Sequence, residues 1–405
     1  MRLEKITQHV YYIGVNDRTT VRFEAMWPLP YGVSYNSYLI IGDNKVAIID
    51  GVGATYALEQ IDHIRAILGN RQPDYLIINH MEPDHSGAIR MLTGAFPSIT
   101  IVGNGQTLNM VNGYYGISDN TQQVKDVETL SLGSDCNLKF YLTPMVHWPE
   151  TMMTYIPEDK VLFSGDGFGC FGALNGAVLD KDMNVNRYWT EMVRYYSNIV
   201  GKYGAFVQKA MAKLQGIEIS TICSTHGPVW QENIEKVLNL YSNLSNYEPL
   251  DNGVTIIYGS MYGNTERVAE TVADGLASAG IKEIEIFNSA KDELSDIIRA
   301  LFTHRGVVLA SPTYSDTLFP PMLQVMEAIK TRNLKNREFL IFGSHTWSPR
   351  AVNIMSRYIE DLTEAPVSLP LTTKQAPTDD FLAQCRKEAF ELADKLNAAS
   401  NSTED

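Results

Sequence analysis

One short segment of the sequence places four potential metal ligands within six residues. The segment His80-Met81-Glu82-Pro83-Asp84-His85 directly follows the β-rich run of residues 75–78. Alternate positions of an extended chain point the same way, so residues 80, 82 and 84 can direct an imidazole and two carboxylates into one cavity. Pro83 disfavours a helix here and favours an extended Glu82. The segment therefore predicts a metal site where a strand meets a loop.

Three further side chains of ligand type stand at the ends of other β-like runs. His147 follows residues 141–144, Asp166 follows residues 161–165, and His226 follows residues 220–225. A lone histidine is more often a satisfied core residue, but burying His, Glu and Asp together without a metal would leave charges unpaired. We therefore expect one shared site. Its candidate ligands are His80, Glu82, Asp84, His85, His147, Asp166 and His226.

A second set of loops is suited to a phosphate-bearing cofactor. The first is Ser260-Met261-Tyr262-Gly263-Asn264-Thr265, which lies between an expected strand and an expected helix and lacks the Gly-Lys-Ser/Thr of a Walker A loop. Hydroxyls, an amide and the N–H groups of a helix N-terminus can hold one phosphate without a cationic side chain. Taken alone, this loop could equally be an ordinary turn between a strand and a helix.

Two more loops occupy corresponding positions after later strands. They contribute Pro312, Thr313 and Tyr314, and then Ser344, His345, Trp347 and Ser348. Open α/β sheets bind ligands at the carboxyl ends of their strands, where Tyr314 and Trp347 can flank an isoalloxazine ring. Trp347 alone could be a packed aromatic residue, but three loops in register favour FMN.

The chain divides into two expected domains that carry these two sets of residues. Residues 1–249 mix short β-rich runs (10–13, 38–41, 46–50, 75–78, 100–102 and 161–164) with helical periodicity at 57–68 and 189–214, typical of a mixed α/β domain. In residues 250–405, strands at 254–258, 284–287, 307–310 and 339–342 alternate with helices at 265–279, 293–302, 322–331 and 379–399. This alternation predicts a doubly wound parallel sheet.

Composition narrows the possible partners. The 405 residues carry 33 Lys and Arg against 47 Asp and Glu, a net charge of -14, which disfavours nucleic acid and anionic membranes. Cys136, Cys170, Cys223 and Cys385 form no C-x-x-C pair, so a zinc ribbon, a rubredoxin-type iron site and a thioredoxin motif are excluded. Free thiols, together with the lack of a secretion signal or an apolar membrane span, predict a cytoplasmic protein.

The first motif resembles that of the metallo-β-lactamase superfamily, whose hydrolases carry H-x-H-x-D-H. Here Glu82 stands where the second histidine would be. A carboxylate in place of an imidazole makes the site harder and more anionic, which suits iron better than a hydrolytic zinc pair. The departure therefore points from hydrolysis toward redox chemistry.

A metallo-β-lactamase-like domain with Glu82 in its motif, followed by a flavodoxin-like domain, resembles the flavodiiron proteins over nearly the whole chain. The resemblance implies an αββα sandwich followed by a flavodoxin-like doubly wound parallel sheet, with FMN passing electrons to a non-haem di-iron centre. It implies reduction of O2 to water, of NO to N2O, or of both. One iron would be held by His80, Glu82 and His147 and the other by Asp84, His85 and His226, with Asp166 bridging.

The same resemblance implies an electron donor, an oligomeric state and aromatic residues near the irons. Since the cysteines cannot form a rubredoxin, electrons would come from a separate rubredoxin, a reductase or reduced coenzyme F420. The family also implies a head-to-tail homodimer, or a tetramer of such dimers. Aromatic groups near the irons would come from Phe23, Trp27, Tyr195 and Tyr196, although the two tyrosines could equally serve helix packing.

Two rival functions use the same residues differently. The first is a di-zinc hydrolase or thioesterase with a flavodoxin-like sensor domain. The second is an electron-transfer protein that uses only its flavin domain and carries a dead metal site. A complete set of ligand types at the motif positions argues against the second rival.

Overall fold

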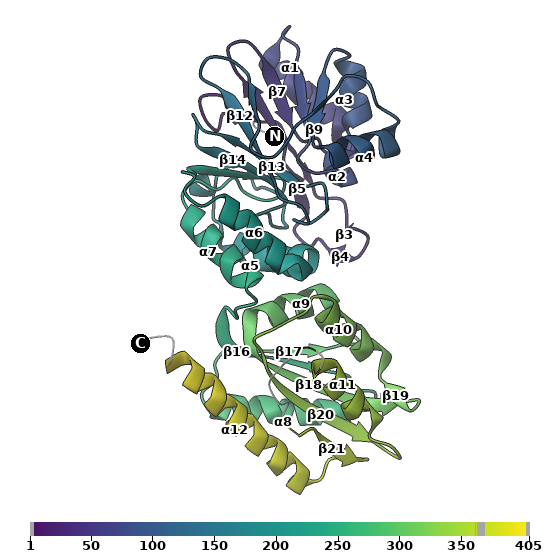
Figure 1. Ribbon diagram of the computed structural model, residues 1–405. Helices are drawn as coiled ribbons and strands as arrows, with labels where there is room; N and C mark the ends of the chain where they lie inside the picture. Colours follow the sequence, from purple (N-terminus) through teal and green to yellow (C-terminus); the bar gives the residue numbers. More distant parts are fainter. Residues whose placement is uncertain (1–3, 361, 363–368, 402–405) are drawn as a thin grey trace. The chain divides into compact units, whose positions relative to one another are not determined.

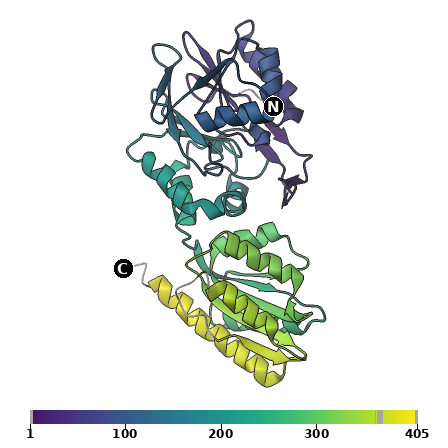
Figure 2. The ribbon, with the colours of Figure 1, turned by 45° about the vertical axis from the view of Figure 1, so that its right-hand side comes forward.

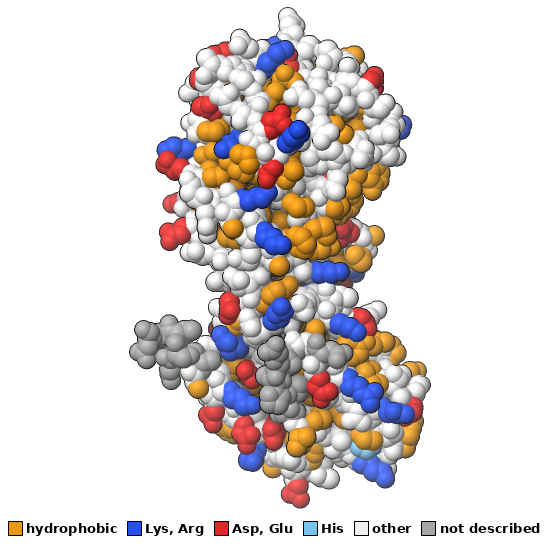
Figure 3. All heavy atoms as spheres, viewed as in Figure 1, with side chains coloured by type: hydrophobic (Ala, Val, Ile, Leu, Met, Phe, Trp, Pro, Cys, Tyr) orange, Lys and Arg blue, Asp and Glu red, His pale blue; other side chains and the backbone are white. Residues whose placement is uncertain are grey.

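The computed structural model describes residues 4–360, 362 and 369–401, and the chain forms two compact units, Met1–Ser245 and Asn246–Asp405 (Figure 1). No helix among these described residues is long and apolar enough to cross a bilayer. On the face drawn in Figure 3, basic and acidic side chains are interspersed on both units.

The first unit contains two facing β-sheets. The six-stranded sheet has the order β1 (Val10–Tyr12), β6 (Tyr38–Ile41), β7 (Val46–Ile49), β8 (Tyr75–Ile77), β9 (Thr100–Gly103), β10 (Thr121–Gln123). The five-stranded sheet has the order β11 (Thr129–Ser131), β12 (Asn137–Leu142), β13 (Met152–Ile156), β14 (Val161–Gly165), β15 (Thr221–Ser224). Two small ribbons pair β2 (Val15–Asp17) with β5 (Val33–Tyr35), and β3 (Arg22–Phe23) with β4 (Trp27–Pro28).

Side chains from both sheets form the core between them. The ring of Tyr38 on β6 lies 5.3 Å from the ring of Phe163 on β14. Its hydroxyl donates a 2.6 Å hydrogen bond to the carbonyl of Ser224 on β15. Every residue of β7, β13 and β14 is buried, as expected for strands covered on both faces.

Helices lie outside both sheets, which gives the order helix, sheet, sheet, helix (Figures 1 and 2). Beside the first sheet are α1 (Ala57–Leu68), the short α2 (Pro83–Ser86), α3 (Ile89–Ala95) and α4 (Gly105–Tyr115). Beside the second sheet are α5 (Asn186–Tyr195), α6 (Gly204–Lys213) and α7 (Ile234–Ser245). Helix α1 has the bounds that its periodicity predicts.

The single helix predicted for residues 189–214 is wrong. A π-helical turn (Tyr196–Val200) and a 3-10 turn (Gly201–Tyr203) separate α5 from α6. The β-branched pair Ile199-Val200 and the two glycines at 201 and 204 lower helix propensity at this point. The apolar periodicity continues across the break, which is why the sequence pattern did not reveal it.

The second unit has the strand order of a flavodoxin-like sheet. Its parallel strands are β17 (Ile284–Asn288), β16 (Asp251–Tyr258), β18 (His304–Tyr314), β20 (Glu338–His345) and β21 (Leu371–Lys374). The order of these strands along the chain is 2-1-3-4-5, which places a topological switch point beside β16. The short β19 (Thr317–Leu318) pairs antiparallel with the end of β18.

Helices cover both faces of this sheet (Figures 1 and 2). One face carries α8 (Asn264–Ser278) and α12 (Asp379–Asn401), whose Val272 and Ala389 join Ile256 of β16 in one buried cluster. The other face carries α9 (Leu294–Thr303), α10 (Pro320–Thr331) and α11 (Arg350–Glu360). Sequence analysis did not identify α11 or β21, although the buried residues of α11 recur at helical spacing.

Candidate metal centre and flavin pocket

The seven predicted ligands of the first unit follow the ends of strands from both sheets. His80 and Glu82 follow β8, and Asp84 and His85 lie on α2. His147 lies between β12 and β13, Asp166 directly follows β14, and His226 follows β15. The structure brings all seven together in two adjoining groups.

The first group consists of His80, Glu82, His147 and Asp166, all buried, with potential ligand atoms within 4.8 Å of one another. Nε2 of His147 lies 3.1 Å from Oε2 of Glu82 and 3.0 Å from Oδ2 of Asp166. Nε2 of His80 lies 3.3 Å from the same Glu82 oxygen. Two imidazoles and two carboxylates thus converge on one point.

The second group consists of Asp84, His85 and His226. Oδ2 of Asp84 lies 3.2 Å from Nε2 of His85 and 3.3 Å from Nε2 of His226. The other oxygen of Asp166, Oδ1, lies 3.1 Å from Nε2 of His85. The carboxylate of Asp166 therefore presents one oxygen to each group.

The expectation that Pro83 disfavours a helix here is wrong, and the helix that begins at Pro83 explains why the ligands form two groups. Helix α2 begins at Pro83, because a proline at the first helical position sacrifices no hydrogen bond. Glu82 just before it is extended, with φ -56° and ψ 138°, as expected. The helical turn takes Asp84 away from His80 and Glu82 and places it with His85 in the second group.

Electrostatics in both groups favour positive charge. Burial disfavours the protonated form of His85 and His147, but neighbouring carboxylates outweigh it and raise each pKa to about 9. Burial would raise the pKa of Glu82, yet hydrogen bonds from His147 and His80 hold it well below its usual range. The carboxylate of Glu82 therefore stays ionised, and a cation bound beside it would balance its charge.

Several buried polar atoms at the centre make no hydrogen bond among the described residues. They are both carboxylate oxygens of Asp84, both ring nitrogens of His85, and Nε2 of His226. Buried polar atoms are normally satisfied, so a cluster of nitrogen and carboxylate oxygen atoms without hydrogen bonds fits a site that binds cations. The donor set fits two metal ions with mixed His and carboxylate ligands.

A layer of partners behind the ligands holds them in place. Nδ1 of His80 lies 2.9 Å from Oε1 of Glu150, and Nδ1 of His226 lies 2.8 Å from the carbonyl oxygen of Ser34. The buried Asp50 accepts hydrogen bonds from the backbone N–H groups of Asn79 (2.7 Å) and His80 (3.3 Å). The ring nitrogens Nε2 of His80 and His226 are thereby directed toward the candidate metal positions.

The hairpin between β3 and β4 adds residues that sequence analysis missed or left open. Glu24, at its tip, accepts a 3.0 Å hydrogen bond from Nε1 of Trp27. Partial desolvation and the negative charge of Glu82 raise the pKa of Glu24 to about 7, although the residue itself lies at the surface. The rings of Phe23 and Tyr195 each lie 5.4 Å from that of His226, so both line the second group.

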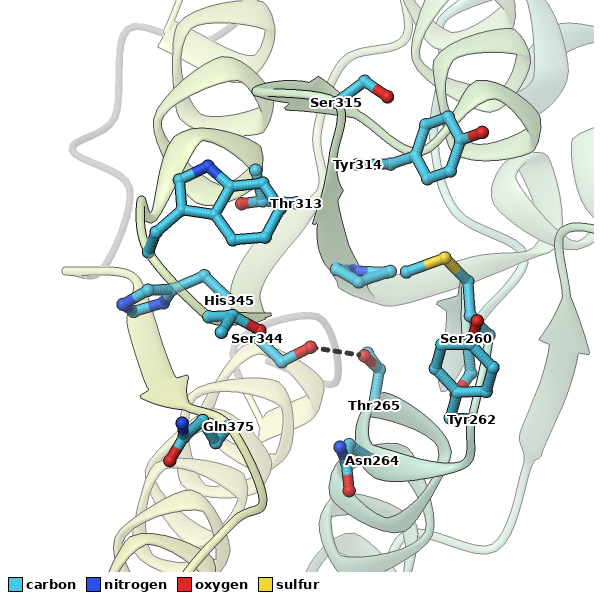
Figure 4. Close-up of a pocket in the computed structure, with 14 residues that line it drawn as sticks. Ser260, Tyr262, Asn264, Thr265, Thr313, Tyr314, Ser315, Ser344, His345 and Gln375 are labelled. Atoms are coloured by element: carbon cyan, nitrogen blue, oxygen red, sulfur yellow. Dashed lines mark hydrogen bonds between the residues drawn. The ribbon is translucent and has the colours of Figure 1, made fainter.

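The second unit holds a pocket of about 440 Å³ at the carboxyl ends of β16, β18 and β20 (Figure 4). The predicted cofactor residues that line it are Ser260, Met261, Tyr262, Asn264, Thr265, Pro312, Thr313, Tyr314, Ser344, His345 and Trp347. Ser315, Thr346 and Gln375 also line it and were not predicted. Gly263 and Ser348 are not among its lining residues.

Two hydroxyls meet at the base of this pocket. Oγ1 of Thr265, at the start of α8, lies 3.0 Å from Oγ of Ser344 on β20 (Figure 4). Gly263 has φ +89°, a left-handed conformation that glycine adopts without strain, and its N–H donates to Oγ of Ser260. The loop therefore turns tightly into a helix N-terminus, the arrangement that favours a phosphate group. Three aromatic residues that line the pocket are exposed: Tyr314 and Trp347, the pair predicted to flank the ring, at 44% and 72%, and Tyr262 at 92%.

Comparisons with known proteins agree with this geometry. Residues 33–227 match the ODP family beta lactamase profile and residues 256–388 match the flavodoxin profile. Anaerobic nitric oxide reductase flavorubredoxin from Escherichia coli K12 is 30% identical over 394 residues, 96% of this chain and 81% of that protein. Rubredoxin oxygen:oxidoreductase from Desulfovibrio gigas has a TM-score of 0.92 at 28% identity and covers 98% of this chain and 99% of its own. The flavodiiron protein from Giardia intestinalis also has a TM-score of 0.92 at 28% identity, over 98% of this chain and 97% of its own.

Proposed function

The chain belongs to the flavodiiron protein family, and from that premise we propose that its two groups of buried ligands hold the two iron ions. We assign His80, Glu82 and His147 to one iron and Asp84, His85 and His226 to the other, with Asp166 bridging. The protein is a flavodiiron oxidoreductase that reduces O2, NO or both. Its cofactors are FMN and a non-haem di-iron centre.

When bound, two ferrous ions and a two-electron flavin together supply the four electrons that reduction of O2 to water requires. The protein's own side chains hold and orient these groups. The carboxylates of Glu82, Asp84 and Asp166 supply hard oxygen ligands, which favour iron in its higher oxidation state. Phe23 and Tyr195 exclude water from the second group because their rings pack on His226.

The observation that carries the proposal is the position of Asp166 between the two groups. One buried carboxylate faces a histidine of each group at about 3 Å, which is the arrangement that a bridged pair of metals needs. A hydrolytic zinc pair would use the same bridge, but Glu82 replaces the imidazole that such a site carries. The flavin pocket of the second unit also favours the oxidoreductase over the hydrolase, because a flavin supplies electrons and hydrolysis needs none.

The test combines metal analysis with rapid mixing. We expect about two irons and one FMN per chain in the purified protein, the stoichiometry that two ligand groups and one pocket allow. Anaerobically reduced protein is then mixed with O2 and, separately, with NO in a stopped-flow instrument. Oxidation of the flavin by at least one substrate supports the proposal. Two zincs per chain, or reduced protein that neither substrate oxidises, would refute it.

We further propose that the electron donor is a separate molecule. The sequence has no C-x-x-C pair to bind a rubredoxin-type iron within these 405 residues. A rubredoxin, a flavin reductase or reduced coenzyme F420 would fill the role. Reduction of the bound FMN by each candidate under anaerobic conditions distinguishes them.

We also propose that the working assembly is a head-to-tail homodimer, alone or as part of a tetramer, and that the protein is cytoplasmic. The dimer is proposed because the metal groups and the flavin pocket lie in different units, so electrons must pass from one unit to another. Four buried free cysteines are consistent with a reducing compartment. Sedimentation and subcellular fractionation test the two statements.

A further inference from the structure

Glu150 and His80 form a buried pair behind the proposed metal centre. Oε1 of Glu150 lies 2.9 Å from Nδ1 of His80, and neither side chain is exposed. Because Nδ1 faces Glu150, the opposite nitrogen, Nε2, faces Glu82 and Asp166. A ring N–H donated to a carboxylate fixes the tautomer and orientation of a ligating histidine and makes it a stronger ligand.

The carboxylate of Glu150 is itself held in place. The backbone N–H of Met81 donates to the same Oε1 at 2.8 Å, and Nδ2 of Asn104 donates to the backbone oxygen of Glu150. Glu150 follows His147 by three residues, so one loop supplies a proposed ligand and also orients a second one. Contacts with His80 and Met81 therefore fix the carboxylate of Glu150, and the contact with Asn104 fixes its backbone.

The second oxygen of Glu150 leaves part of its negative charge without a hydrogen-bonded partner among the described residues. Oε2 is buried and makes no hydrogen bond among the described residues. A buried carboxylate with an unused oxygen is costly unless a positive charge lies nearby. His80 connects this carboxylate directly to the proposed metal position, so a cation bound at Nε2 of His80 would supply that charge.

Among the described residues, no carboxylate accepts a hydrogen bond from Nδ1 of either histidine of the second ligand group, although the charge of the buried Asp50 acts on His85 through space. Nδ1 of His226 faces the neutral carbonyl oxygen of Ser34 at 2.8 Å, and Nδ1 of His85 is buried and has no hydrogen bond to any residue that the structure describes. A hydrogen bond to a charged acceptor is roughly twice as strong as one to a neutral acceptor. The two groups therefore hold their histidines with unequal strength.

We propose that Glu150 is a positioning residue that makes the His80 group the tighter of the two metal sites. The inference rests on the ligand role proposed above for His80. It predicts that the two irons leave the protein in two steps. The iron held by Asp84, His85 and His226 should leave first. The iron held by the His80 group should leave second.

The experiment follows release of Fe(II) from the iron-loaded full chain to a chromogenic chelator under anaerobic conditions. Wild-type protein is expected to release one iron in a fast phase and one in a slow phase. Glu150→Gln is expected to accelerate the slow phase about 10- to 100-fold and leave the fast phase unchanged. Mössbauer spectra should show a change in one of two ferrous signals. Release of both wild-type irons in one phase, or an unchanged slow phase in Glu150→Gln, would overturn the inference.

Three further variants separate the possible explanations. Glu191→Gln removes another buried carboxylate of the same unit, one that pairs with Arg194 at 2.6 Å, and should leave both phases unchanged. Glu150→Asp keeps the charge and should retain most of the slow phase; a loss as large as that of Glu150→Gln would contradict the charge argument. His80→Ala should abolish the slow phase. If His80→Ala retains both irons, the proposed ligand assignment itself fails. If His80→Ala loses the slowly released iron but Glu150→Gln releases iron as the wild type does, only the role of Glu150 is refuted.

Discussion

Oγ1 of Thr225 donates a hydrogen bond of 2.5 Å to Oδ1 of Asp166. The same oxygen faces His85 of the second ligand group, while Oδ2 faces His147 of the first. Burial alone would raise the pKa of Asp166, but the charges of His80 and His85 and a hydrogen bond from His147 hold it far below its usual value. Asp166 is therefore a permanently ionised link between the two groups.

Asp166→Asn should remove iron and activity while leaving FMN bound. Asparagine has the same shape and can still accept from Thr225, so the change isolates the loss of one negative charge. We expect iron affinity to fall at least about 100-fold, at the upper end of the effect of disturbing a metal's immediate surroundings. Iron and flavin content per chain are the measurements. Retention of both irons with normal turnover would contradict the bridging role.

Glu82→His should shift the metal preference of the first group from iron toward zinc. The substitution restores the imidazole-rich motif of the hydrolases and removes a hard oxygen ligand. Protein produced in medium with equal iron and zinc is analysed for both metals, with Glu82→Asp as the control that retains a carboxylate. If the histidine variant keeps its full iron content and turnover, ligand hardness does not set the metal.

Much of the metal centre could be predicted because its residues are concentrated at strand ends. Four potential ligands lie within six residues after β8, and the remaining three each follow another strand. Glu24 and Glu150 could not be predicted in this way, since each acts through a residue far away in the sequence. Glu24 lies near Glu82, and Glu150 contacts His80, 70 residues earlier. Only the tertiary fold, which places the β3–β4 hairpin beside Glu82 and the loop before β13 beside His80, brings these pairs together.

The flavin pocket shows the same limit on a smaller scale. The loops after β16, β18 and β20 follow from the alternation of strands and helices, which fixes where carboxyl ends of strands lie. Gln375 follows β21, a short strand that the sequence pattern did not reveal, so its place in the pocket was missed. Ser348 was expected to line the pocket because it directly follows Trp347 in the sequence, but it does not line it.

The flavin released from the purified protein should be FMN and not FAD. The hydroxyls of Thr265 and Ser344 meet at the helix N-terminus, where one terminal phosphate fits. Thr265→Val replaces a buried hydroxyl by a methyl group of similar size. It should weaken FMN binding about 10-fold, which is the effect of losing one hydrogen bond to a charged group. Chromatography of acid-released flavin and a flavin titration are the measurements. Release of FAD would refute the assignment, and Tyr358→Phe in α11, away from the pocket lining, is the control.

The second unit should lose stability as pH rises above neutrality. His304 donates to Asp251 (2.6 Å) and lies 2.9 Å from Glu285. Burial disfavours its charged form, but the two carboxylates outweigh this and raise its pKa to about 9. The usual pKa of histidine is about 6.5, so below about pH 6.5 the protonated His304 contributes its full stabilisation to the fold. This contribution is lost as the pH rises toward the folded-state pKa of about 9.

The size of this effect is limited by solvent. The side chains of Asp251 and Glu285 are 35% and 34% exposed, so we expect only about 1 to 2 kcal/mol of unfolding free energy. Urea unfolding of the flavin-bearing unit, measured from about pH 6 to pH 9.5, should show this loss in the wild type and not in His304→Gln. An equal pH dependence in the variant would assign the loss to other groups.

The proposed head-to-tail dimer makes a prediction about which chains cooperate. If the FMN of one chain reduces the irons of the other, the two active pairs of a symmetric dimer each use residues from both chains. A heterodimer can separate the two halves of the reaction. One chain carries Asp166→Asn, which removes the metal centre, and the other carries a flavin-null loop at Asn264 and Thr265.

Two different affinity tags allow this heterodimer to be isolated free of both parent homodimers. With transfer between chains, the FMN of the Asp166→Asn chain faces the intact metal centre of its partner, so one of the two pairs works and about half of the wild-type activity survives. With transfer inside each chain, neither chain has both a flavin and a metal centre, and the heterodimer is inactive. Each parent homodimer must be inactive under both models, which makes them the matched controls. An inactive heterodimer that retains iron in one chain and FMN in the other would therefore exclude the head-to-tail arrangement.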